Sequence, residues 1–93
     1  MFLEIVTPEA ILFSSEVKSI LVPGVNGEFQ MLNNHAPIVS ILKEGAIKIE
    51  SSNFEVDEKY KSKFTKTEDG KMSFSIHSGT LELNDNKAII LAD

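Results

Sequence analysis

The sequence lacks cysteine and tryptophan, and among its 93 residues it has only one tyrosine and three prolines. Without cysteine, neither a disulfide framework nor a thiolate metal site can form, so the redox compartment is not strongly constrained. No apolar run approaches the roughly 20 residues of a membrane span. Glu4 and Pro8 come too early for the apolar core of a signal peptide. We therefore expect no direct membrane insertion and a place in the cytosol or on the matrix side.

Positive charge is also scarce, because nine basic side chains stand against fourteen acidic ones and leave a net charge of −5. Such a balance repels phosphate backbones, so we expect no nucleic-acid partner. Apolar residues make up 42% and charged residues 25%, which is ordinary for a soluble globular protein. A chain of this length can bury one small core, and we expect residues 1–93 to form a single domain.

Short β-rich runs separated by turn residues recur along the whole chain and predict an all-β sandwich or barrel. The alternating runs are FLEIV, EVKSILV ending at Pro23-Gly24, GEFQML, AIKIE, MSFSIHS, TLEL and KAIILA, the last two flanking the turn residues Asn84-Asp85-Asn86. Alternation in GEFQML places Phe29 and Met31 on one face and Glu28 and Gln30 on the other. In AIKIE, Ile47 and Ile49 face the core. APIVSIL is apolar on nearly both faces, which predicts a segment buried on two sides.

The segment FEVDEKYKSKFTKTEDGK is ambiguous. Val56, Tyr60 and Phe64 stand four residues apart and would line one face of a helix. Glu68-Asp69-Gly70-Lys71, between FTKT and MSFS, instead predicts an Asp-Gly hairpin. We favour an elongated hairpin.

No motif in the sequence carries a reaction, so we expect no catalytic, cofactor-binding or metal-ligating residues. His35 and His77 are the only histidines, and neither has acidic or histidine neighbours at metal-ligand spacing. The loop from Pro23 to Pro37, crowded with turn residues at both ends, is therefore interpreted as a surface that another protein touches. Two alternatives stay open: a small enzyme using His35 as general base with Glu28 as its orienting partner, and a free-standing β-sandwich binding module.

The stretch VPGVNGEFQMLNNHAPIVSILKEGAIKI closely resembles the epsilon subunit of rotary F-type ATP synthases. Gly27-Glu28-Phe29, Asn34-His35-Ala36-Pro37 and Lys43-Glu44-Gly45 follow one another in the family's order. The opening LEIVTPEAILFSSEVKSILVPG and the closing SGTLELNDNKAIILAD are also similar to the family. The chain departs from it at Gln30, at Asn33 and in an extra stretch around residues 51–71. It stops at Leu91-Ala92-Asp93, where typical members continue into a two-helix domain.

The resemblance implies a flattened β-sandwich of about ten short strands, here with no C-terminal helical hairpin. It implies a non-catalytic rotor subunit of the central stalk, which binds the gamma subunit and the polar loops of the c-ring and couples proton-driven rotation to ATP synthesis. Such a subunit lies peripherally on the cytoplasmic face of the bacterial inner membrane, or on the equivalent organellar side. Glu28 is expected to meet the c-ring loops. The expected gamma and c-ring interface comprises Glu28, Phe29, Gln30, Met31, Leu32, Asn33, Asn34, His35 and Ser40.

Overall fold

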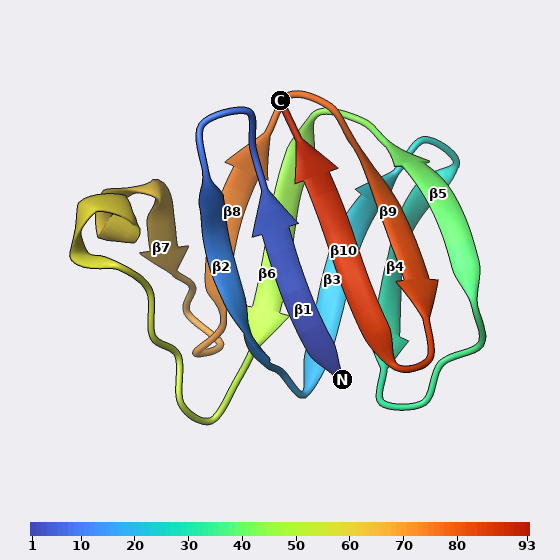
Figure 1. The fold of residues 1–93 in the computed structure, drawn as a ribbon, viewed down its shortest axis with the longest axis horizontal. Helices are drawn as coiled ribbons and strands as arrows, with labels where there is room; N and C mark the ends of the chain where they lie inside the picture. Colours follow the sequence, from blue (N-terminus) through green and yellow to red (C-terminus); the bar gives the residue numbers. More distant parts are fainter.

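The computed structural model describes all of residues 1–93 as ten β-strands and one short 3₁₀ helix, η1 (Figure 1). All-β architecture with about ten short strands is therefore confirmed. The elements are β1 Phe2–Val6, β2 Ile11–Glu16, β3 Ser19–Gly24, β4 Gly27–Leu32, β5 Ile38–Leu42, β6 Gly45–Glu50, η1 Glu58–Lys63, β7 Phe64–Lys66, β8 Met72–Ile76, β9 Gly79–Asn84 and β10 Lys87–Ala92.

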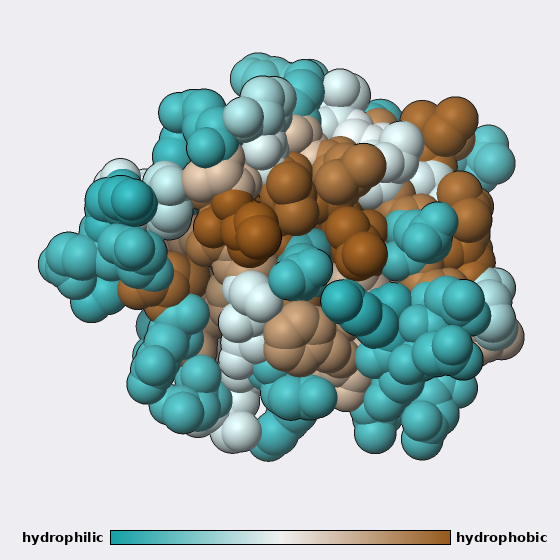
Figure 2. All heavy atoms as spheres, in the orientation of Figure 1, coloured by the Kyte–Doolittle hydropathy of each residue, from teal (hydrophilic) through white to brown (hydrophobic).

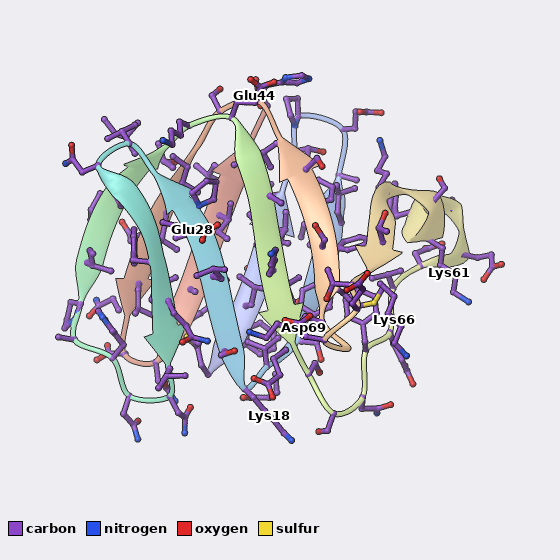
Figure 3. All side chains as sticks on the ribbon, turned by 180° about the vertical axis from the view of Figure 1, so that it is seen from behind. Lys18, Glu28, Glu44, Lys61, Lys66 and Asp69 are labelled. Carbon is purple, nitrogen blue, oxygen red and sulfur yellow. The ribbon has the colours of Figure 1, made fainter.

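One continuous sheet curls into two facing layers. The strand order is β2-β1-β10-β9-β5-β3-β6-β8-β7, and β4 pairs with β3 outside this path. Strands β2, β1, β10, β9 and β5 form the front layer in Figure 1, and the rear layer is nearest the viewer in Figure 3. The layers are joined where β5 meets β3 at the single pair Gly24–Leu42. Only β1 and β10 pair in parallel.

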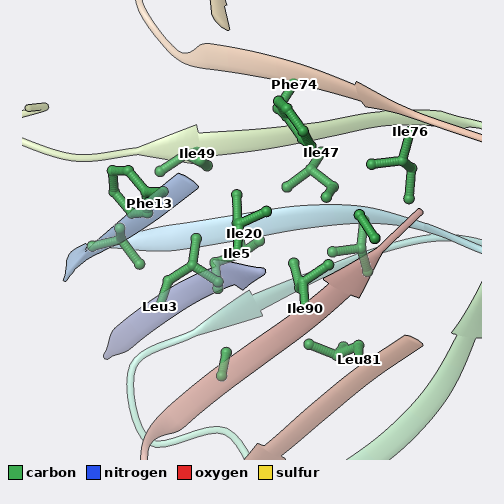
Figure 4. Packing of buried hydrophobic residues seen from close by; sticks show 14 of the residues in the cluster. Leu3, Ile5, Phe13, Ile20, Ile47, Ile49, Phe74, Ile76, Leu81 and Ile90 are labelled. Carbon is green, nitrogen blue, oxygen red and sulfur yellow. The ribbon is translucent and has the colours of Figure 1, made fainter. Parts of the chain in front are cut away.

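The core lies between the two layers and consists of 20 buried hydrophobic residues in one cluster. Strands of both layers contribute alternate side chains to it, including Leu3, Ile5, Ile20, Ile47 and Ile90 (Figure 4). The predicted core positions Ile47 and Ile49 are confirmed. Each fully buried side chain of this size stabilises the fold by about 1.5–3 kcal/mol through transfer from water.

Strand β3 extends further than predicted, because Pro23-Gly24 is still paired with β4 and the turn is Val25-Asn26. Proline usually ends a ladder because it has no N–H to donate. Pro23 is accommodated because it stands in a non-hydrogen-bonded pair with β4, while its carbonyl accepts the N–H of Lys43 at 2.9 Å from the other side.

The predicted burial of β5 on both faces is wrong. Val39 is 76% exposed and Ile41 is 64% exposed, whereas Leu42 is buried. Strand β5 closes one side of the sandwich, so only one of its faces meets the core. The apolar residues on its other face are left uncovered in this chain.

Residues 51–71, here called the lobe, combine both readings of the ambiguous segment. Strands β7 and β8 form the predicted hairpin, and Thr67 closes its turn by an N–H···O bond of 2.8 Å to Lys71. The Thr67 hydroxyl also donates to Asp69, which lowers the pKa of that carboxyl group. The elongated hairpin is wrong for the preceding residues, because Asp57 accepts the N–H of Lys59 at 3.2 Å and starts η1.

Phenylalanine rings attach the lobe to the sandwich. Phe54 stacks on Phe13 of β2 with 5.2 Å between ring centroids, and it meets Phe64 edge-on at 5.3 Å. Phe64 in turn contacts Phe74 of β8 at 5.2 Å. Such pairs add about 0.5–1.5 kcal/mol each beyond the area they bury, so this ring cluster fixes the lobe against the open side between the layers.

Candidate docking surface

Strand β4 presents the predicted alternation. Met31 is fully buried and Phe29 is half-buried, whereas Glu28 and Gln30 are exposed. Glu28 lies on the outer side of the rear layer (Figure 3). Met31 therefore belongs to the core and is not accessible to a partner, although it was among the expected interface residues.

The corner after β4 is held by a cluster of amide side chains. The Asn33 side-chain oxygen accepts from the α-ammonium group of Met1 at 2.5 Å and from the Asn86 amide at 3.1 Å. The Asn34 N–H donates to the Asn86 side-chain oxygen at 2.8 Å, and Asn34 itself adopts φ 64°. Asn33 thus fastens the corner to the turn between β9 and β10 rather than projecting freely.

His35 is exposed at this corner, and its ring nitrogen Nδ1 lies 2.7 Å from the carbonyl oxygen of Ala36. Glu28 stands at the other end of β4, and the four steps along the strand from Glu28 to Leu32 alone span about 13 Å. The structure therefore does not bring His35 and Glu28 into hydrogen-bond range, as the enzyme alternative requires. Ser40 is half-buried, on the face of β5 opposite to Val39 and Ile41.

Exposed apolar side chains gather on the front layer. Register aligns Ile41, Thr80, Leu91, Val6 and Ile11 in one row across five strands. The neighbouring row contains Val39 and Ile89. We call this surface the apolar band and define it as Val6, Ile11, Val39, Ile41, Ile89 and Leu91.

Figure 2 shows brown side chains of the apolar band in the middle of the front layer and at its β5 side, separated by paler and hydrophilic residues. The register places Thr80 and Glu82 of β9 between the two groups. Ile11, Val39, Ile41 and Leu91 are each more than half exposed. A shallow groove of about 480 Å³ runs between Val39 and Leu91. Single exposed apolar residues are ordinary, whereas a group of them on one face is a candidate surface for contact with another molecule.

The interface expected from the sequence, Glu28 to His35 and Ser40, contains no residue of the apolar band. The available signal was a run of consecutive apolar residues in two strands, IVSIL in β5 and AIIL in β10. A strand with one face on the core needs apolar residues only at alternate positions, so the extra ones indicate a second covered face.

The chain has no group of three or more His, Asp or Glu side chains that could hold a metal ion. The ring nitrogen Nδ1 of His77 lies 3.6 Å from a carboxylate oxygen of Glu44, and both side chains are exposed. The single helix, η1, is far too short and polar to cross a membrane.

Comparison with known proteins identifies a family. Residues 1–63 match the model of the ATP synthase, Delta/Epsilon chain, beta-sandwich domain. The ATP synthase epsilon chain of Chlorobium limicola is 38% identical over 91 residues, an alignment that covers 98% of this chain and 86% of that one. The epsilon chain of Campylobacter curvus is 39% identical over 93 residues, but this chain spans only 60% of its length.

Solved structures agree in fold. A chain of the Tetrahymena thermophila mitochondrial ATP synthase central stalk and c-ring superposes with a TM-score of 0.73 at 17% identity, covering 99% of this chain and 62% of that chain. A chain of the Euglena gracilis mitochondrial ATP synthase gives a TM-score of 0.72 at 22% identity, covering 97% and 48%. The sequence matches carry the conclusion beyond fold: this chain belongs to the delta/epsilon family of ATP synthase chains and has its β-sandwich domain.

Proposed function

We propose that this chain is a non-catalytic rotor subunit in the central stalk of an F-type ATP synthase, where it joins the gamma subunit to the c-ring and couples proton-driven rotation to ATP synthesis. Its relatives are named ATP synthase epsilon chains, and its structural neighbours belong to mitochondrial ATP synthases. As part of that complex it lies peripherally at the membrane, on the cytoplasmic face in bacteria or on the equivalent organellar side.

The observation that carries the proposal is the apolar band. The chain has a net charge of −5, yet four large apolar residues on its front layer are more than half exposed. Such a surface is suited to a stable interface with another protein. We assign the gamma subunit to this surface, because a subunit that transmits torque needs a large apolar interface rather than a few polar contacts.

The c-ring contact is assigned to Glu28, on the opposite layer. Its carboxylate is exposed, carries the only charge on β4, and forms no ion pair or hydrogen bond within the chain. A free carboxylate on a rigid hairpin is suited to meet basic or polar groups on the ring loops. Leu32, Asn34 and His35 are exposed along the same hairpin and corner.

A titration of the cognate gamma subunit with the purified chain tests the proposal. We expect saturable binding with a Kd in the micromolar range or tighter, as for an interface of ordinary size. Ile41→Asp places a charge in the apolar band and should weaken binding at least about tenfold, because the carboxylate must be desolvated. Ser75→Asp makes the same charge change on the exposed face of β8 and is the matched control. Absence of binding by the parent at tens of micromolar, or equal losses in both variants, would contradict the proposal.

A further inference from the structure

Strand β4 has one unpaired edge. It pairs with β3 along all six of its residues and with no other strand. In an antiparallel ladder, residues alternate between those whose N–H and C=O groups meet the neighbouring strand and those whose groups point the other way. The unpaired edge of β4 therefore exposes the backbone groups of every second residue.

The tight turn fixes which residues these are. Gly24 and Gly27 flank the two-residue turn as a hydrogen-bonded pair, so Phe29 and Met31 also bond to β3. The alternate residues Glu28, Gln30 and Leu32 direct their N–H and C=O groups outward. Only the Leu32 carbonyl finds a partner there, the N–H of His35 at 3.2 Å.

Two other edges of the sheet, those of β2 and β7, are protected in ways that natural proteins commonly use. The edge of β2 faces Glu55, Val56 and Asp57 of the lobe across an open pocket of about 400 Å³, and its pairing with β1 has a register shift. Strand β7 is only three residues long and ends in Lys66. Strand β4 has six residues, no lysine, no proline and no register shift.

We propose that the edge of β4 accepts one further β-strand, supplied by an extended segment of the gamma subunit. This proposal rests on the proposed function. Main-chain hydrogen bonds to Glu28, Gln30 and Leu32 would give the added strand its register, as in other cases of strand addition. An unprotected edge of this length is otherwise a template for aggregation.

Continuity with the apolar band favours gamma as the source of the strand. The C-terminal end of β5 meets the turn that precedes β4, because Leu42 pairs with Gly24 at the end of β3. The turn before β4 is tied directly to β5, because the Val25 N–H donates to the Ile41 carbonyl at 3.1 Å. Val25 and Leu32, at the two ends of β4, are about half exposed. A partner seated on Ile41 thus reaches the turn from which β4 starts.

A second copy of this chain fits the edge less well, because each copy carries a net charge of −5 and the two would repel each other.

Binding at the edge also leaves the side chain of Glu28 available. Backbone groups of a strand point within the plane of the sheet, whereas side chains stand perpendicular to it. One residue can therefore bond gamma through its backbone and face the ring through its carboxylate.

Gln30→Pro is the variant that tests the edge. Proline removes the outward N–H and places its ring there, and it is tolerated where no ladder bond is lost. The variant should bind gamma about tenfold or more weakly, because the buried strand loses a hydrogen bond and meets a steric block. Ser14→Pro, at an outward position on the β2 edge, is the matched control and should bind like the parent.

Two further measurements keep the test decisive if Gln30→Pro folds poorly. An N-methyl group on the Gln30 nitrogen, introduced by chemical ligation, removes the same donor and keeps the side chain. In the parent, the amides of Glu28 and Gln30 should exchange with solvent rapidly in the free chain and slowly once gamma is bound.

The outcomes separate the two proposals. If the parent chain does not bind gamma, both the proposed function and the strand addition are overturned. If the parent binds but the modified chains bind equally well, or the two amides stay unprotected, only the strand addition is overturned. Protection that rises with chain concentration in the absence of gamma would assign the edge to a second copy and also overturn it.

Discussion

The side chain of Glu28 in β4 makes no interaction that stabilises the fold. It stands opposite Pro23 in a pair without ladder hydrogen bonds, and it is exposed without an ion pair. Surface positions of this kind change stability by no more than about 0.5 kcal/mol when substituted. Any large effect of changing Glu28 must therefore arise in a complex.

We expect Glu28→Lys to fold like the parent and to attach poorly to the c-ring. Loss of an interfacial charge pair and the new repulsion should cost roughly 2 kcal/mol or more of ring binding. Co-purification of the assembled synthase, together with thermal unfolding of the free chain, measures both parts. Glu68→Lys makes the same charge change in the turn of the lobe and is the control. A Glu28→Lys chain that still yields ring-attached, coupled synthase would refute the role given to this carboxylate.

Other residues of the expected interface show where local pattern stops being informative. Alternation alone placed Glu28 outside and Met31 inside, and the structure agrees. The role of Asn33 was not predictable, because its partners Met1 and Asn86 are 32 and 53 residues away. When the hydrogen-bond partners of a side chain are distant in the sequence, the pattern of residues around that side chain does not indicate them.

Strand β5 and the lobe show the same limit at the scale of elements. The sequence predicted both as β-structure, and the turns and alternation of β4, β6 and β8 were correct. The two apolar faces of β5 were misread, because hydrophobicity indicates a covered face but does not say whether the cover is the same chain. A helix around Tyr60 was weighed but not favoured, because a 3₁₀ segment of six residues has too few turns to show a clear period.

At the scale of elements we predict that Phe54→Ala releases the lobe. Phe54 is the ring between Phe13 and Phe64, and it is half-buried, so its loss should lower the free energy of unfolding by about 1–3 kcal/mol. Hydrogen exchange should accelerate in residues 51–63 while the strands of the front layer stay protected. Phe2→Ala removes another half-buried ring, in β1, and should not accelerate the lobe selectively. Uniform acceleration throughout the chain in Phe54→Ala would show that the lobe is not a separate unit.

The molecule as a whole combines an acidic surface with one apolar strip. At pH 7 the net charge of −5 keeps copies of the chain apart, although the apolar band is exposed on each of them. The sequence pI is about 4.9, so this repulsion disappears as the pH falls toward that value. Solubility of the free chain then depends on its charge, because the apolar band is present at every pH.

We therefore predict reversible self-association of the free chain near pH 5 and none at pH 7. Light scattering across this range measures it. Ile41→Ser removes one large apolar side chain from the apolar band without changing any charge, and it should reduce the association at pH 5. Thr65→Ser, on the exposed surface of β7, is the control and should not reduce it. Association of the two variants to the same extent would mean that the apolar band is not the contact.

The parallel pairing of β1 with β10 has a consequence for how the chain folds during synthesis. Strand β10 lies between β1 and β9, so the front layer is divided until residues 87–92 are available. The first strand is synthesised long before β10, its neighbour on one side, so its apolar residues stay uncovered on that side until residues 87–92 are available. Because contacts between distant parts of a chain form slowly, the front layer should become complete, and available to partner subunits, only after β10 has left the ribosome.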